Sequence, residues 1–212
     1  MTIIMLAAGT SSRMGKENKM LLPYKDSPMV THCCMQALEF LSSYSRSTDT
    51  ACRLVVVTGY RRQSVEKALK PCKTFIEDTD ARLEMLIVNN PSYRNGQFSS
   101  TKVGVKQVNE GCSFFISLAD MPLVKADNYS TLVPLLRDYD AVRPFYENNG
   151  QRIPGHPVLH AFKLKQEILK YPDNWTVSKI LSKSNIIEPS FSDLSWIKDI
   201  DESNDYKSII GS

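Results

Sequence analysis

Short, continuous apolar runs recur along the chain and predict buried strands. Four of these runs are rich in β-branched and large aliphatic side chains, which is typical of strands covered on both faces of a sheet. Two further strands are expected in the second half of the chain. The predicted strands cover residues 2–7, 53–58, 83–88, 113–119, 140–146 and 186–188.

Between these runs, apolar residues recur with a period close to 3.6, which predicts amphipathic helices. Residues 42–50 are polar and irregular and predict a loop. Pro71 is expected to end a helix, and residues 150–154 are expected to turn the chain. The predicted helices cover residues 29–41, 61–69, about 99–108, 127–136, 162–169, 175–182 and 202–210.

The alternation of strands with helices predicts an α/β fold. No internal repeat, low-complexity segment or domain boundary is visible, so we expect one domain over residues 1–212. We predict a Rossmann-like three-layer sandwich, with a mainly parallel sheet and helices on both faces. In such sheets, ligands bind beyond the carboxyl ends of the strands.

The segment that follows the first strand carries the strongest chemical signal. It reads L-A-A-G-T-S-S-R-M-G over residues 6–15 and then K-M-L-L-P over residues 19–23. Small residues let backbone N–H groups approach a polyanion, while Arg13 and Lys19 add positive charge. The segment therefore predicts a triphosphate cradle. It is neither a P-loop nor a dinucleotide fingerprint, because Gly-Lys-Ser/Thr and G-x-G-x-x-G are both absent.

The other predicted strands also end in small or polar residues. Thr58 and Gly59 follow the second strand, and Asn90 follows the third. Ser99 or Ser100 is expected to cap the next helix, whose N-terminus could contact an anion or a ribose. At the end of the fourth strand, the carboxylate of Asp120 is well placed to hold Mg²⁺ against phosphates.

Several of these segments together resemble the MobA-like nucleotidyltransferases, in family order and over nearly the whole chain. Besides residues 6–23, the resemblance rests on N-P-x-Y-x-x-G-x-x-S-S over residues 90–100 and D-M-P over residues 120–122. G-H-P-V-L over residues 155–159 and D-I-D over residues 199–201 complete it. L-A-A-G instead of L-A-G-G, together with G-H-P-V-L, resembles the molybdenum cofactor cytidylyltransferases, whose fold is of the nucleotide-diphospho-sugar transferase type.

The resemblance implies transfer of CMP from CTP to the terminal phosphate of molybdopterin, with release of pyrophosphate. It implies Mg²⁺ held by Asp120 and Asp201, and catalytic charge from Arg13 and Lys19. The implied nucleotide-binding residues are Leu6, Ala7, Ala8, Gly9, Ser12, Arg13, Gly15, Lys19, Thr58, Gly59, Asn90, Ser99 and Ser100. The implied contacts to the second substrate are Pro122, His156, Pro157, Asp173 and Asp199.

One segment departs from the family pattern. Where relatives carry a D-x-G-A-R-like run facing the second substrate, residues 173–179 read D-N-W-T-V-S-K. This departure leaves a sugar or polyol phosphate open as the acceptor. A non-catalytic molybdopterin-binding maturation chaperone is the alternative from another class. A molybdenum-hydroxylase apoenzyme is a possible partner. His32 and His160 are expected to have no chemical role.

Composition narrows the picture only modestly. With 42% hydrophobic and 23% charged residues, the 212-residue chain is ordinary for a soluble globular protein. A net charge of +3 without a basic tail does not favour nucleic acid. No apolar run predicts a membrane span or a signal peptide. Five cysteines without C-x-x-C fit a reducing cytoplasm. We expect a monomer or a weak homo-oligomer.

Overall fold

A mixed, mostly parallel sheet forms the centre of the protein. The computed structural model describes residues 1–9, 18–200 and 205–206, and among them seven strands form one sheet in the order β11-β7-β10-β6-β1-β4-β5. The parallel part contains β1 (Thr2–Ala7), β4 (Cys52–Thr58), β5 (Leu83–Asn89) and β6 (Phe114–Leu118). β10 (Val158–His160) is antiparallel to β6 and to β7 (Ala141–Val142), and β11 (Ile186–Ile187) is parallel to β7.

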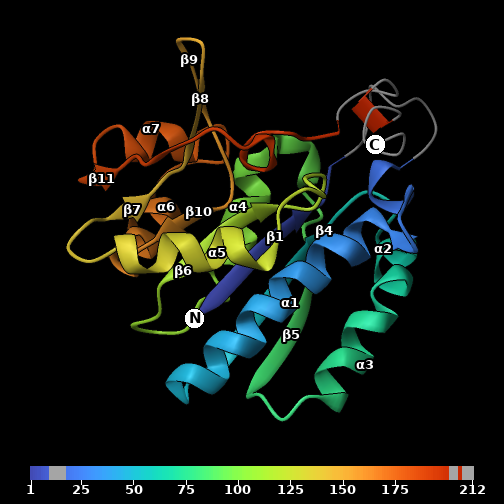
Figure 1. Cartoon of the computed structure of the whole chain (residues 1–212). Helices are drawn as coiled ribbons and strands as arrows, with labels where there is room; N and C mark the ends of the chain where they lie inside the picture. Colours follow the sequence, from blue (N-terminus) through green and yellow to red (C-terminus); the bar gives the residue numbers. More distant parts are fainter. Residues whose placement is uncertain (10–17, 201–204, 207–212) are drawn as a thin grey trace.

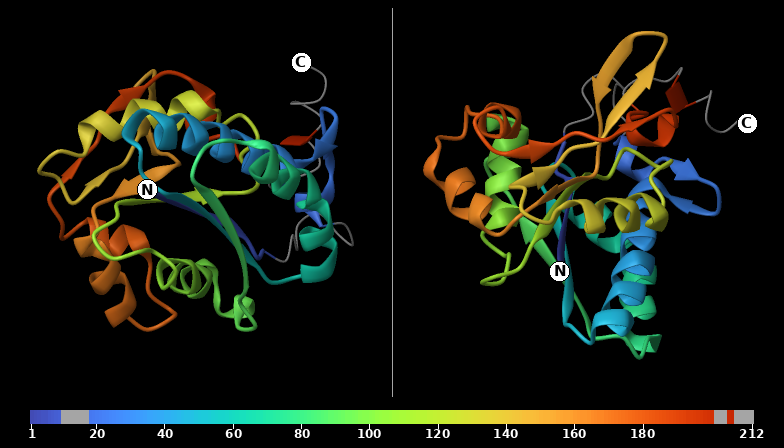
Figure 2. Two further views of the ribbon diagram at one scale, coloured as in Figure 1. Left: turned by 90° about the horizontal axis from the view of Figure 1, so that it is seen from below. Right: turned by 60° about the vertical axis from the view of Figure 1, so that its left-hand side comes forward.

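Helices cover both faces of this sheet, as Figures 1 and 2 show. Because side chains alternate along β1, Ile3 and Met5 enter one apolar core, and Ile4 and Leu6 enter the other. The first core lies under α1 (Met29–Thr48), α2 (Arg62–Ala68), α3 (Lys70–Asp78) and α5 (Ala126–Leu132). The second lies under α4 (Gln97–Val105), α6 (Lys163–Lys170) and α7 (Val177–Leu181). The predicted three-layer α/β fold is confirmed.

Smaller elements complete the described chain. β8 (Phe145–Asn148) and β9 (Gln151–Pro154) form a hairpin that projects from the body, with β12 (Ser190–Phe191) beside β8 (Figure 1). β2 (Pro23–Tyr24) pairs with β3 (Ser27–Pro28). Single 3₁₀ turns are η2 (Lys19–Leu21), η3 (Tyr93–Asn95), η4 (Val133–Leu135) and η5 (Leu194–Trp196). No helix in the described parts of the chain is long and apolar enough to span a membrane.

The loop predicted over residues 42–50 is wrong, because α1 continues to Thr48. Ser42 and Ser45 are small enough to be buried, and their hydroxyl groups find partners in Thr79 and in the carbonyl of Thr50. The helix ends where Asp49 adopts a left-handed conformation with φ 52°. The polar composition of this segment therefore concealed about two further turns of helix, in which Ser42 and Ser45 are buried.

Two proline-based predictions also need correction. Pro71 does not end a helix but lies in the first turn of α3, where a missing N–H costs nothing. The strand predicted over residues 140–146 is interrupted at Arg143 and Pro144, which separate β7 from β8. The turn predicted over residues 150–154 is confined to Asn149 and Gly150, both with positive φ, and β9 follows it.

The predicted caps of α4 are wrong as well. The helix begins at Gln97 with Gly96 as its N-cap, so Ser99 and Ser100 lie inside the first turns. The helix predicted over residues 127–136 is α5 followed by η4, and that over residues 175–182 shortens to α7 behind the N-cap Thr176. Most of the helix predicted over residues 202–210 lies outside the described residues.

Candidate functional site

The site begins where Lys19 meets Asp120. Asp120 follows β6 and Lys19 lies in η2, and β6 is the sheet neighbour of β1. The Nζ of Lys19 lies 2.5 Å from the Oδ2 of Asp120, and the two side chains are only 10% and 15% exposed. Partial burial strengthens such a pair relative to a surface one. Two residues that the sequence placed at the same site are thus in direct contact.

The C-terminal segment reaches the same place. The backbone N–H of Ile200 donates to the carbonyl of Asp120 at 3.0 Å. Asp201, the predicted second metal ligand, is the next residue but lies outside the described residues, as do Ser12, Arg13 and Gly15. Asp199 precedes Ile200 on the same segment. The segment that leads to Asp201 therefore lies beside Asp120, the residue with which Asp201 is expected to share a metal ion.

The end of β1 packs tightly against its neighbours. Leu6, Ala7 and Ala8 are buried, whereas Gly9 is exposed. A Cβ on Gly59 would lie 2.9 Å from the carbonyl oxygen of Ala8 and 2.8 Å from the Cβ of Tyr93, so only glycine fits there. The hydroxyl of the fully buried Thr58 donates to the carbonyl of Val88. Thr58 therefore supports the strand end and does not present its hydroxyl to solvent.

Asn90, Ser99 and Ser100 form one internal network. The Nδ2 of Asn90 donates to both serine hydroxyls at 2.9 Å, and its Oδ1 accepts from the N–H of Ser92 at 3.0 Å. All three predicted residues are buried. The network holds the loop before α4 in place, so its contact to a nucleotide stays a prediction.

His156, one of the predicted second-substrate residues, is held between two backbone carbonyl groups. His156 is clamped beside Trp196, whose carbonyl accepts its N–H at 2.8 Å, and its Nδ1 lies 3.5 Å from the carbonyl oxygen of Ile116. Burial lowers the pKa of His156, while the Ile116 carbonyl and the Asp120 charge oppose that fall. His156 is therefore within electrostatic reach of Asp120.

The other predicted second-substrate residues have different surroundings. The carbonyl of Pro122 meets the Nε2 of His32 at 3.1 Å. Pro157 is buried and follows His156 through a cis peptide bond. Asp173 pairs with Lys102 at 3.1 Å, and Lys102 also donates to the carbonyl of Tyr171. His32, expected to have no chemical role, also packs edge-on against Tyr24.

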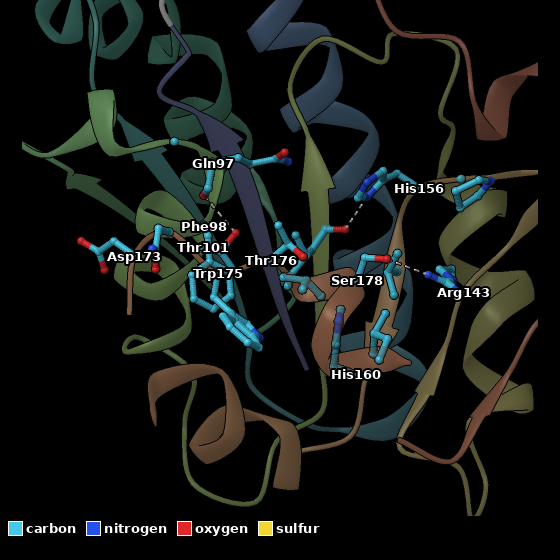
Figure 3. A pocket seen from close by; sticks show the side chains of 18 of the residues that line it. Gln97, Phe98, Thr101, Arg143, His156, His160, Asp173, Trp175, Thr176 and Ser178 are labelled. Atoms are coloured by element: carbon cyan, nitrogen blue, oxygen red, sulfur yellow. Dashed lines mark hydrogen bonds between the residues drawn. The ribbon is translucent and has the colours of Figure 1, made fainter. Parts of the chain in front are cut away.

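A pocket of about 460 Å³ opens beside this site (Figure 3). It lies between α4, the faces of β6 and β10, the segment over residues 173–176, and α7. His156 and Asp173 both line it, so the structure brings these two predicted residues together, whereas Pro122, Pro157 and Asp199 are not among its lining residues.

Sequence reasoning missed several residues of this pocket, namely Phe98, Arg143, His160 and Trp175. They come from four separate segments, and each looks like a core or surface residue when the sequence is read alone. A tryptophan in the otherwise polar stretch 173–176 was the one signal that could have found the pocket.

The metal-ligand set is partly described. Within residues 1–9, 18–200 and 205–206, no group of three or more His, Cys, Asp or Glu residues could hold a metal ion. Mg²⁺, however, commonly uses one or two carboxylates together with substrate phosphates. Asp120, which already faces the Lys19 ammonium, fits that donor set.

Several solved structures share the fold of this chain over nearly its whole length. The protein is similar to Rv0371c from Mycobacterium tuberculosis H37Rv, with a TM-score of 0.75 at 19% identity, covering 100% of this chain and 98% of that one. It is also similar to a nucleotidyl transferase from Methanothermobacter thermautotroptrophicus, with a TM-score of 0.74 at 18% identity and coverages of 99% and 95%.

A third similar structure is molybdopterin-guanine dinucleotide biosynthesis protein A from Archaeoglobus fulgidus. Its TM-score is 0.65 at 15% identity, and the match covers 100% of this chain and 97% of that one. At these identities the likeness shows the fold. No curated protein matches the sequence.

The sequence itself matches a family description over most of its length. Residues 3–187 match the MobA-like NTP transferase domain. The match contains Lys19, Asp120 and His156, which the fold brings to one edge of the sheet. The chain therefore belongs to the MobA-like NTP transferase family.

Proposed function

We propose that this nucleotidyltransferase transfers CMP from CTP to the terminal phosphate of a molybdopterin and releases pyrophosphate. The observation that carries the proposal is the contact between Lys19 and Asp120. It joins the K-M-L-L-P and D-M-P segments at the carboxyl ends of adjacent parallel strands, beside a pocket large enough for an acceptor. Ligand pockets typically have volumes of about 300–1,000 Å³.

The chemistry needs positioning and charge more than covalent help. An oxygen of the acceptor phosphate attacks the α-phosphorus of CTP, a phosphoanhydride bond forms, and the bond to the β-phosphate oxygen breaks. The acceptor phosphate is already anionic near neutral pH, so no general base is required. Catalysis then depends on holding the two phosphates in line and stabilising the charge that develops.

Named residues supply these effects. Asp120 and Asp201 would hold Mg²⁺, which when bound neutralises charge on the phosphates. Lys19, in contact with Asp120, would stabilise the departing pyrophosphate, and Arg13, which the sequence predicts for the same task, would assist it. A complex of the similar protein Rv0371c with manganese supports the use of a divalent metal.

The nucleotide choice rests on the L-A-A-G form of the first loop. We propose CTP over GTP on that basis, with the remaining nucleotide-binding residues as the sequence indicates. The five cysteines are all free thiols, which supports a reducing cytoplasm as the site of the reaction. The product would be passed to a molybdenum-hydroxylase apoenzyme.

One assay tests the proposal. Pyrophosphate release is measured with each of the four NTPs and Mg²⁺, without an acceptor, with molybdenum-loaded molybdopterin, or with a sugar or polyol phosphate. Calorimetry measures molybdopterin binding alongside. We expect release with CTP that depends on the acceptor. Release with a sugar or polyol phosphate instead would keep the chemistry and replace the acceptor. Tight molybdopterin binding without turnover of any NTP would favour the maturation chaperone and overturn the proposal.

A further inference from the structure

Two side chains of the pocket carry buried polar atoms with no hydrogen-bond partner in the described structure. They are both ring nitrogens of His160 and the indole nitrogen Nε1 of Trp175. Leaving a buried donor or acceptor unsatisfied destabilises the folded state, so native proteins seldom do so without a reason. Both residues line the pocket, so a ligand that enters it and displaces the surrounding side chains would supply the missing partners.

His160 is rigidly placed and uncharged. It lies in β10 directly opposite Phe114 of β6, and the two rings stack with centroids 5.0 Å apart and planes 9° from parallel. Complete burial lowers the pKa of His160 to about 3; the carbonyls of Val158 and Phe114 oppose this fall, but neither forms a hydrogen bond with the ring. A neutral imidazole offers one N–H donor and one bare nitrogen as acceptor.

Trp175 is held in a different way. Its ring stacks on Tyr171, with centroids 4.8 Å apart and planes 6° from parallel, and the ammonium groups of Lys179 and Lys183 lie 4.9 and 5.9 Å from its centroid. These contacts occupy the ring and leave the indole N–H without a partner. In the view of Figure 3, Trp175 and His160 lie toward the lower end of the pocket.

The rest of the pocket suits an uncharged group. Phe98, Ile116, Val158 and Leu181 supply apolar surface, and uncharged polar side chains lie among them, namely Asn95, Gln97, Thr101, Asn174, Thr176 and Ser178. Its charged members already have partners, because Asp173 pairs with Lys102 and Arg143 pairs with Glu188. The choice of a flat ring over a sugar or polyol therefore rests on the unpartnered nitrogens of His160 and Trp175 and not on the lining as a whole.

The pocket also has a direction. His156 meets the Ile116 carbonyl and feels the charge of Asp120, whereas His160 pairs with Phe114, two residues further from Asp120 along β6. Two strand residues span about 6–7 Å. An acceptor whose phosphate lies near Asp120 therefore extends its other end toward His160.

We propose that this pocket receives the ring end of the acceptor as a planar, uncharged nitrogen heterocycle, and that His160 and Trp175 determine specificity by hydrogen bonding to its edge. The proposal rests on the proposed function for the position of the acceptor phosphate. It assigns a role to His160, for which the sequence predicted none, and to the segment 173–179, which departs from the family pattern.

Calorimetric titration with free pterin, the ring system without any phosphate, tests the proposal. His160→Phe keeps the stack on Phe114 and removes both nitrogens, and Trp175→Phe removes the indole N–H. Each variant should bind pterin about tenfold more weakly, as expected for one lost hydrogen bond. Tyr44→Phe, which likewise removes one donor from an aromatic side chain, is the control, because Tyr44 lies in α1 against Phe40 and does not line the pocket.

Thermal unfolding separates a specificity role from a structural one. His160→Phe removes two unsatisfied atoms, so it should unfold at the same or a higher temperature while it loses pterin affinity. Unchanged pterin affinity in both variants would overturn the proposal, and so would the absence of pterin binding to the unaltered protein. If His160→Phe does not fold, Trp175→Phe decides alone.

Other ligands distinguish the two proposals. CTP with Mg²⁺ should bind all three variants like the unaltered protein. Pterin binding that weakens in both variants, without NTP turnover on any acceptor, would remove the proposed function and leave the pocket assignment standing. CTP turnover with glucose 1-phosphate and no pterin binding would remove the pocket assignment and leave nucleotidyl transfer standing.

Discussion

The two halves of the sheet build their parts of the site in different ways. In the first half, β1, β4 and β5 are parallel strands of six or seven residues. The segments that follow these strands are expected to supply backbone N–H groups and charged side chains to the site. In the second half, β7, β10 and β11 are strands of two or three residues in mixed directions, and the pocket beside them depends on side chains from distant segments. β6 belongs to both, with Asp120 beyond its end and Ile116 on its pocket face.

The part of the site that depends on strand ends can be predicted from the sequence. The part that depends on side chains from distant segments cannot. The difference between the two halves also separates two tasks. The first half should control catalysis and nucleotide binding, and the second should control which acceptor is used. Single substitutions in each half test this division.

The largest effect is expected at Asp120. Asp120→Asn should lower the turnover number by about 10³-fold or more, because it removes a carboxylate expected to hold Mg²⁺ beside the reacting phosphates. Asp127→Asn, at an exposed position in the first turn of α5, should change turnover less than twofold. Pyrophosphate release at saturating CTP measures both. Near-normal turnover of Asp120→Asn would show that Asp120 serves only the ion pair with Lys19.

A smaller loss is expected at Lys19. Lys19→Ala should reduce turnover by about 10²-fold, as is typical when one donor to a developing charge is removed. Lys25→Ala, a few residues later and exposed, is the matched control. Stopped-flow measurement of the chemical step separates turnover from binding. If only the Michaelis constant for CTP rises, Lys19 contributes to ground-state binding and not to the transition state.

Residue types in the first half explain why much of the fold was predictable. The segments that form β1, β4, β5 and β6 are largely apolar. Gly at a strand end indicates that a ligand can approach the backbone closely, and Asp at a strand end indicates a negative charge. That Lys19 and Asp120 belong to one site followed from two strand ends at one edge of a parallel sheet, whereas the direct contact between the two side chains was not predicted. By contrast, Ser42 and Ser45 looked like loop residues because burial of small hydroxyls depends on tertiary partners.

The pocket could not be predicted for the same physical reason. His160 reads as an ordinary strand residue, and its lack of a partner is a property of the folded chain alone. Trp175 and Lys102 reach the site only because α4 and the segment 171–176 lie side by side, an arrangement that neither segment encodes locally.

Packing in the first half gives a third prediction. Gly104 lets α4 lie close to β1 and β4, and a Cβ there would come within 2.3 Å of Cγ2 of Ile4 and 3.1 Å of Cγ2 of Val57. Gly104→Ala should therefore lower the free energy of unfolding by about 1–3 kcal/mol through overpacking. Gly9→Ala, whose methyl group would meet nothing within 4 Å, should leave it unchanged. Urea unfolding monitored by circular dichroism measures both, and equal stabilities would contradict the tight packing of α4.

The smallest effect concerns pH and the second half. Because His160 has a pKa of about 3 in the folded state and about 6.5 when unfolded, its contribution to stability is complete above pH 6.5 and is lost as the pH falls toward 3. Between pH 7 and pH 5 that loss is on the order of 2 kcal/mol.

His160→Phe should remove this loss and leave a shallower dependence, to which His32 and His156 still contribute in the same direction because burial lowers the pKa of both. Urea unfolding at pH 7 and pH 5 measures the difference. Identical pH dependence in the variant and the unaltered protein would show that His160 is already protonated or is accessible to solvent.

The division between the two halves is tested most directly by a crystal structure with Mg²⁺, a non-hydrolysable CTP analogue and pterin. The account predicts the metal at the carboxylate of Asp120, the triphosphate beside Lys19 and the loop after β1, and the pterin ring against His160 and Trp175. Electron density for the cytosine base in the pocket of His160 and Trp175, or for the metal away from Asp120, would contradict it.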